Sequence, residues 1–142
     1  MSNQDGSKLI GTWRLLTAYI VIQETGERRE IFGDDPQGCI IVAPGGRMMS
    51  LMTSGSRTRA SSEADTTALY KSMMAYTGKV SADHEKFTTR VDMAWDPSWL
   101  GTEQTRYYTL DGDKLRIRTA PHDHPSYPGH KIVGHLEWER EA

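Results

Sequence analysis

The two ends of the chain carry the feature that most constrains its fold. Gly11-Thr12-Trp13 opens the first strand-like run, and Trp138-Glu139-Arg140 closes the last one. A glycine before a buried tryptophan lets the backbone turn into a barrel mouth, and a guanidinium from the opposite end can lie across the indole face, which contributes about 0.5–2 kcal/mol. We therefore expect Arg140 to pack on Trp13. The two ends then meet and close an antiparallel sheet into a barrel.

The composition is that of an ordinary globular domain. The chain has 142 residues, of which 37% are hydrophobic and 25% charged, enough to bury a core and too polar for a membrane protein. We expect one domain over residues 1–142, with residues 1–8 as a flexible N-terminus. The formal net charge of -2 provides no general attraction to polyanions. Neither nucleic acid nor a membrane is therefore an expected partner.

The N-terminal residues and the cysteine content indicate the compartment. The first residues include neither a basic segment nor an apolar one, so no secretory signal is expected there. Cys39 is the single cysteine and cannot form an internal disulfide. These observations favour a reducing, cytoplasmic environment.

Strand signals recur at short spacing along the chain, which is typical of an all-β barrel or sandwich. Pro44-Gly45-Gly46 and Asp111-Gly112-Asp113 provide the positive φ angles that tight hairpins need. The predicted strands cover residues 9–23, 28–32, 38–43, 47–53, 77–81, 87–95, 102–110, 115–119 and 130–140. We expect a barrel of about eight strands with a central cavity.

One helix is expected between residues 61 and 76. Leu69, Met73 and Tyr76 recur at helical spacing, and Ser62 with Asp65 resembles a capping box. We expect the helix to cover a barrel end or side through Leu69 and Met73.

Strict alternation along the first strand predicts which side chains point inward. Trp13 brings Leu15, Thr17 and Tyr19 to the inner face. Leu16, Ile20 and Ile22 then point outward, so we expect the helix or a partner subunit to cover them, with a homodimer as one possibility.

The same alternation assigns inner faces to three later strands. On the strand over 102–110, Gln104, Arg106 and Tyr108 share the inner face with Leu110. The other expected inward residues are Phe87, Thr89, Val91, Met93 and Trp95 on one strand, and Gly134, Leu136, Trp138 and Arg140 on the last. Arg90 and Asp92 are expected to point outward.

Several short motifs occur in an order that resembles a known family. They are residues 9–13 (LIGTW), 35–38 (DPQG), 44–48 (PGGRM), 99–104 (WLGTEQ), 110–115 (LDGDKL) and 136–140 (LEWER). Together they are similar to the small bacterial and fungal lipocalin-like domain family. The resemblance implies a lipocalin-like antiparallel barrel with a central cavity. Relatives in the wider superfamily carry ligands or assist cyclisations, isomerisations and eliminations without a cofactor, but the resemblance supplies no catalytic motif.

The candidate catalytic residues are Arg106, Tyr108 and Tyr19, with Gln104 beside them as a substrate-binding residue. Burying such polar groups without partners costs about 2–7 kcal/mol each, so their inward position implies a wet or liganded cavity. An arginine and two phenols could bind an enolate, phenolate or carboxylate and move a proton. The alternative is an internal salt bridge or water network. His130 and Asp92 are reserve candidates for proton transfer.

The remaining candidate binding residues are apolar or aromatic. Trp95 and Trp99 flank a loop that could stack a flat ligand at the barrel rim or plug the core. Flexible methionine side chains suit an adaptable pocket, although they also fill ordinary cores. The proposed substrate-binding set is Trp95, Trp99, Met52, Met93, Leu136 and Trp138.

No metal or cofactor is expected. Only His122-Asp123-His124 brings potential ligands close together, and alternate residues in a proline-rich loop are more often solvated. Gly45-Gly46 joins two strands, so it is not a phosphate-binding loop. The sequence favours a cofactor-independent isomerase, cyclase or lyase that acts on a small apolar molecule. The alternatives are a carrier or sensor of the same kind of ligand and a dimerising structural module.

Overall fold

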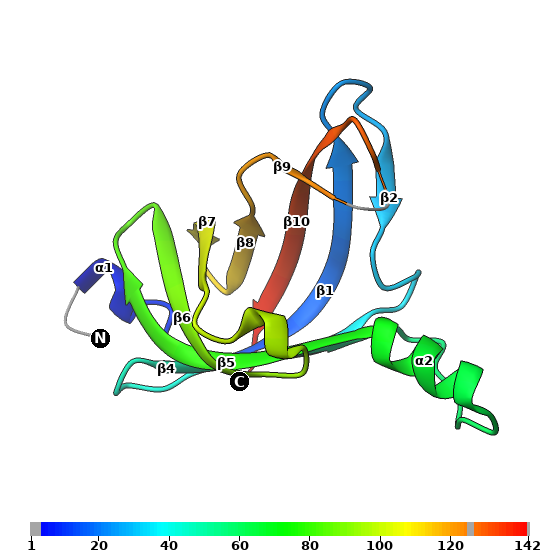
Figure 1. The fold of residues 1–142 in the computed structure, drawn as a ribbon. Helices are drawn as coiled ribbons and strands as arrows, with labels where there is room; N and C mark the ends of the chain where they lie inside the picture. Colours follow the sequence, from blue (N-terminus) through cyan, green and yellow to red (C-terminus); the bar gives the residue numbers. More distant parts are fainter. Residues whose placement is uncertain (1–3, 125–126, 142) are drawn as a thin grey trace.

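A computed structural model describes residues 4–124 and 127–141, which fold into a closed eight-strand antiparallel barrel (Figure 1). The barrel strands are β1 (Gly11–Ile22), β3 (Gln37–Val42), β4 (Arg47–Thr53), β5 (Met73–Ala82), β6 (Lys86–Ala94), β7 (Glu103–Asp111), β8 (Lys114–Arg118) and β10 (Lys131–Arg140). The short strands β2 (Arg28–Glu30) and β9 (His122–Asp123) extend the sheet beside β1 and β10. The predicted fold class is confirmed. β9 lies in a segment that was expected to be a loop.

The barrel closes where the two ends of the chain meet, as predicted. β1 pairs with β10, and Trp13 lies opposite Arg140. The Arg140 guanidinium lies 4.1 Å from the centroid of the Trp13 ring, and it donates to the carbonyl oxygens of Ile10 and Lys8, each at 2.8 Å. Gly11 has φ +139°, and a Cβ there would lie 2.6 Å from Nη1 of Arg140. Glycine is therefore required at this position by both the backbone and the close guanidinium.

The N-terminal segment forms the closed end of the barrel. Residues 1–3 of the predicted flexible N-terminus lie outside the described residues, and α1 (Gln4–Ser7) occupies the next part. Leu9 is buried, and its carbonyl accepts a hydrogen bond of 2.9 Å from the Trp13 indole. Residues 8–10 therefore close this end of the barrel: the Leu9 side chain is buried there, and the carbonyls of the segment accept hydrogen bonds from Trp13 and Arg140.

A register shift in β1 overturns part of the predicted alternation. The pairing with β10 is irregular between Leu15 and Thr17, which is the pattern of a β-bulge. Beyond the shift, Ala18, Ile20 and Ile22 are the buried residues. The expectation that Ile20 and Ile22 point outward and Tyr19 inward is therefore wrong, because one extra residue exchanges the two faces of the strand.

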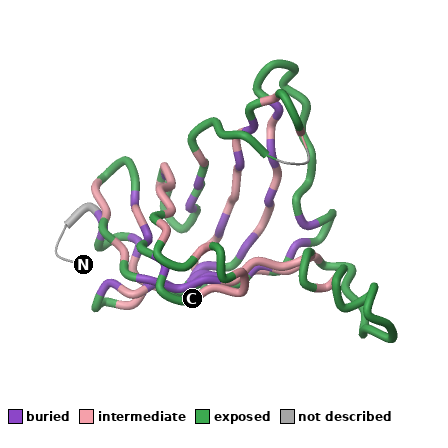
Figure 2. Tube along the Cα trace, in the orientation of Figure 1, coloured by how far each residue is buried: buried purple, intermediate pink, exposed green. Residues whose placement is uncertain are grey.

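A second register shift changes the facing of Met93. Thr77 pairs with Met93 while Gly78 pairs with Val91, so Asp92 is the extra residue on β6. Met93 is 58% exposed on the outer face, whereas Val91 is buried. Figure 2 shows buried segments interspersed with less buried ones along the barrel strands. The predicted inward position of Met93 is wrong for the same physical reason as that of Tyr19.

The helix is shorter than expected and covers no core. α2 spans Glu63–Lys71 and has no buried residue, and Figure 1 shows that it projects beyond the barrel. Ser62 caps it by accepting from the backbone N–H of Asp65, as the capping motif predicted. Met73 and Tyr76 belong to β5 instead, because pairing with β4 overrides their helical spacing. The expected packing through Leu69 and Met73 is therefore wrong.

No helix within residues 4–124 and 127–141 is long and apolar enough to cross a membrane.

Candidate functional site

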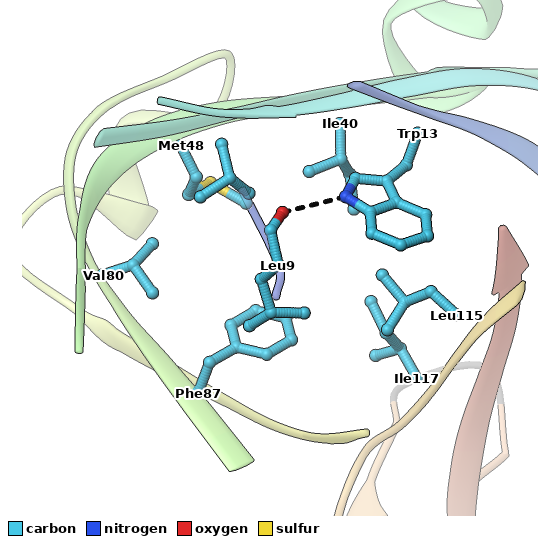
Figure 3. A pocket seen from close by; sticks show the side chains of 9 residues that line it. Leu9, Trp13, Ile40, Met48, Val80, Phe87, Leu115 and Ile117 are labelled. Atoms are coloured by element: carbon cyan, nitrogen blue, oxygen red, sulfur yellow. Dashed lines mark hydrogen bonds between the residues drawn. The ribbon is translucent and has the colours of Figure 1, made fainter. Parts of the chain in front are cut away.

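The closed end of the barrel is filled by apolar side chains. Nine of them, including Leu9, Trp13 and Phe87, enclose a cavity of about 10 Å³. Figure 3 shows Leu9 within this ring of side chains. Such a cavity has room for about one water molecule, so this apolar plug leaves no space for an organic ligand.

Arg106 on β7 lies at the centre of a polar chain on the barrel wall. Its register partner across β6 is Phe87, which places both side chains on the inner face. One guanidinium nitrogen of Arg106 donates to Oε1 of Gln104 at 3.3 Å and the other to the Thr105 carbonyl at 3.0 Å. The Gln104 amide in turn donates to the Thr102 hydroxyl at 2.9 Å, which donates to the Trp99 carbonyl at 2.7 Å. Arg106 and Gln104 share the inner face, as predicted, and the polar chain leads toward the end of the barrel opposite the plug.

Tyr76 on β5 is a site residue that the sequence analysis missed. It is buried, and Ser50 on β4 is its direct cross-strand partner. Burial raises the pKa of Tyr76, while the positive charge of Arg106 acts in the opposite direction. The phenol is therefore protonated at neutral pH and available as a hydrogen-bond donor. The sequence analysis placed Tyr76 in the predicted helix, so it was not considered as an inward residue of a strand.

Three fully buried side chains carry polar atoms without hydrogen-bond partners in the described part of the chain. They are Ser50 Oγ, Thr89 Oγ1 and Trp138 Nε1, on β4, β6 and β10. Thr89 pairs with Gln104, so it lies beside the polar chain of β7. We name Ser50, Tyr76, Thr89, Gln104 and Arg106 the inner polar wall. Ser50 could have been found from the sequence. It lies two residues from both Met48 and Met52 on β4 and therefore shares their inner face.

Aromatic side chains line the approach to the inner polar wall. The ring centroids of Trp95 and Trp99 are 5.2 Å apart, and Trp99 lies 5.2 Å from Tyr76. Tyr70 of α2 follows at 6.4 Å from Trp95 and donates to its carbonyl oxygen. This series, the aromatic mouth, runs from the exposed Tyr70 to the buried Tyr76.

Solvent reaches the inner face between the aromatic mouth and Arg106. Met74, Trp99 and Leu136 pack on the core and are only partly buried, and Gln104 and Arg106 are also partly buried. The same inner face is fully buried at Trp13 and Trp138. The inner face is therefore less buried near Arg106 and Trp99 than at the plug.

The other predicted site residues lie at different places in the fold. Tyr108 is buried, but its hydroxyl donates to the Asp83 carbonyl in the turn between β5 and β6. Met52, Leu136 and Trp138 lie on inner faces as expected, with Met52 and Trp138 within the core. The structure thus brings Arg106, Gln104 and Trp99 together and directs the Tyr108 hydroxyl elsewhere.

Tyr19 belongs to a row of stacked groups on the outer face. Its ring stacks on His135 at 5.0 Å, and the Arg28 guanidinium lies 3.7 Å from its centroid. Burial lowers the pKa of His135, and the charges of Arg118 and Arg28 lower it further, while Glu137 acts in the opposite direction. A hollow of about 180 Å³ lies beside His135, between Tyr107 and Arg118.

The reserve candidates also lie away from the inner polar wall. Asp92 forms a bidentate ion pair with Arg47, with nitrogen–oxygen distances of 3.0 and 2.8 Å. The His130 ring nitrogen lies 3.3 Å from a Glu24 carboxylate oxygen. Within the described residues no cluster of three or more histidine, cysteine, aspartate or glutamate side chains could hold a metal ion.

Comparison with protein families agrees with the barrel fold. No curated protein matches the chain. Residues 10–141 match the family described as the lipocalin-like domain, which covers all eight barrel strands and both residues of the Trp13–Arg140 contact. The chain belongs to the lipocalin-like domain family.

Proposed function

We propose that the barrel takes up a small, largely apolar organic molecule and acts on it as a cofactor-independent isomerase, cyclase or lyase. The lipocalin-like barrel fold supports small-molecule handling in general. The observation that carries the proposal is the inward, partly buried Arg106 guanidinium near the buried Tyr76 phenol. A barrel interior kept only for stability would more often be apolar at these positions.

The chemistry that these groups support is stabilisation of a developing negative charge on oxygen. A guanidinium and a protonated phenol are both fixed donors, and donors placed in a site with little water stabilise an enolate-like oxygen strongly. Because burial keeps the Tyr76 pKa above its ordinary value, Tyr76 acts as a donor and not as the base, and the α-proton passes to a solvent water or hydroxide. Trp99 and Leu136 provide the apolar surface for the rest of the molecule.

A carrier function is the second candidate, and one observation favours it. All five histidines lie within the described residues, and none of them belongs to the inner polar wall. Histidine is the side chain that most often transfers protons in catalysis, so a wall without one favours holding a ligand over transforming it.

Deuterium exchange into an enolisable aromatic ketone separates the two functions. We expect 2-tetralone in D₂O to exchange its α-protons faster with the protein than in buffer alone. Tyr76→Phe and Arg106→Leu should each reduce the protein-dependent rate by about tenfold or more, the effect of losing one oxyanion donor or charge-assisted bond. Arg90→Leu, on the outer face, is the control. Binding of 2-tetralone without exchange would favour the carrier, and absence of both would contradict both functions.

The homodimer and the cytoplasmic location stay predictions from the sequence. Sedimentation of the purified protein measures the first.

A further inference from the structure

We infer that the ligand of this barrel is an anion and that it binds head first, with its carboxylate-type group at the inner polar wall and its flat apolar part in the aromatic mouth. This inference rests on the proposed function, since it assumes that the interior is the site that takes up a ligand.

The charge balance of the inner polar wall points to an anion. The described residues place no carboxylate within 4.0 Å of the Arg106 guanidinium, whose contacts are the Gln104 side chain and the Thr105 carbonyl. The carboxylates of Asp92 and Glu139 instead pair with arginines and a lysine on the outer face. A partly desolvated cation held only by neutral acceptors gains most from a negatively charged partner.

Two buried hydroxyl groups without hydrogen-bond partners also favour an anionic ligand. Ser50 and Thr89 are 1% and 0% exposed, and neither hydroxyl has a hydrogen-bond partner among the described residues. Ser50 lies directly across from Tyr76, and Thr89 lies directly across from Gln104. Directly paired residues have Cβ atoms about 4.5–5.5 Å apart, so these hydroxyls lie close to the groups that would hold the anion. Buried polar atoms without partners are costly, and an oxyanion can accept from several donors at once.

The shape of the interior determines the direction of the ligand. The plug encloses a cavity of about 10 Å³, so a ligand cannot extend past Phe87 and Leu9. The Arg106 guanidinium donates to Gln104, which lies on the mouth side of Arg106 along β7, so the charged group is directed toward the mouth. The aromatic rings at Trp99 and Trp95 lie at the mouth and can stack on a planar apolar group. A ligand that enters with its anionic group first can place that group at Arg106 and its planar apolar part against the aromatic rings of the mouth.

A matched pair of probes tests the inference. We expect 2-naphthoate to bind about tenfold or more tightly than the neutral 2-naphthalenemethanol, the effect of one charge-assisted hydrogen bond. Arg106→Met should abolish this preference by weakening 2-naphthoate alone. Affinities are measured by NMR titration of the ¹⁵N-labelled protein, in which the indole N–H signal of Trp99 also reports whether the probe lies at the aromatic mouth.

Arg116→Met is the matched control, because Arg116 is exposed on the outer face of β8 and contributes to the 180 Å³ hollow there. It should leave both affinities unchanged. If Arg116→Met instead removed the preference, the anion would bind outside the barrel and the inference would be overturned.

The remaining outcomes separate this inference from the proposed function. Equal affinity of the wild-type protein for the two probes would overturn the anionic head group while leaving small-molecule uptake intact. Binding of neither probe would overturn both. If Arg106→Met fails to fold, the wild-type comparison and the Trp99 indole shift still decide: a preference for 2-naphthoate with a shifted Trp99 signal supports the inference, and an unshifted Trp99 signal contradicts it.

Discussion

Gly11→Ala should destabilise the domain more than an ordinary glycine substitution, because two separate costs meet at this residue. The backbone φ of +139° is unfavourable for alanine, at about 1–3 kcal/mol. In addition, the new Cβ would lie 2.6 Å from Nη1 of Arg140, so the guanidinium must move. Its displacement weakens two hydrogen bonds to backbone carbonyls and the contact with Trp13, together about 2–3 kcal/mol for a partly exposed side chain.

The expected total is about 3–6 kcal/mol, which lowers the Tm by about 10–20 °C for a domain of this size. Urea and thermal unfolding followed by circular dichroism measure it. Gly26→Ala is the control, because Gly26 also has a positive φ of +73°, but a Cβ added there would meet no other atom within 4 Å. It should cost only the backbone part.

A double-mutant cycle with Arg140→Met isolates the contact. Without the guanidinium, the Cβ at position 11 meets nothing, so Gly11→Ala should cost only the backbone part in that background. An equal cost of Gly11→Ala with and without Arg140 would refute the reasoning. So would a loss no larger than that of Gly26→Ala.

Two further predictions test the faces and the titration of the sheet. Met52→Lys should destabilise the domain by about 3 kcal/mol or more because it places a charge in the core, whereas Met93→Lys on the exposed outer face should change stability by about 0.5 kcal/mol at most. Urea unfolding compares them, and equal losses would contradict the register shift in β6. The pKa of His135 lies below its ordinary value in the folded protein, so the unfolded chain takes up the proton first as the pH falls below about 6.5. Stability should therefore fall on acidification from pH 7.5 to 5.5, and His135→Gln should reduce that fall; an unchanged slope would show that His135 does not contribute.

The candidate site could be predicted only in part from the sequence. The inward facing of Arg106 and Gln104 followed from counting along a strand without a register shift, and the structure places both there. Trp99 followed from its place in a loop beside the barrel. Tyr76 and Thr89 could not be recognised as neighbours of Arg106, because their proximity depends on how β4, β5, β6 and β7 pair.

The sequence by itself determined the closure of the barrel and its hairpins. The closure depends on residue types that can be recognised in the sequence: a glycine at position 11, an indole at Trp13 and a guanidinium at Arg140. The hairpins can be recognised in the same way, because their turns need glycines with positive φ angles. Only the tertiary structure decided that Tyr19 and Met93 face outward. An extra residue in a strand is accommodated by the partner strand, and alternation read along one strand cannot detect it. The same holds for Met73 and Tyr76, whose helical spacing gave way to a strand because pairing with β4 supplies the backbone hydrogen bonds and buries Tyr76 against the barrel core.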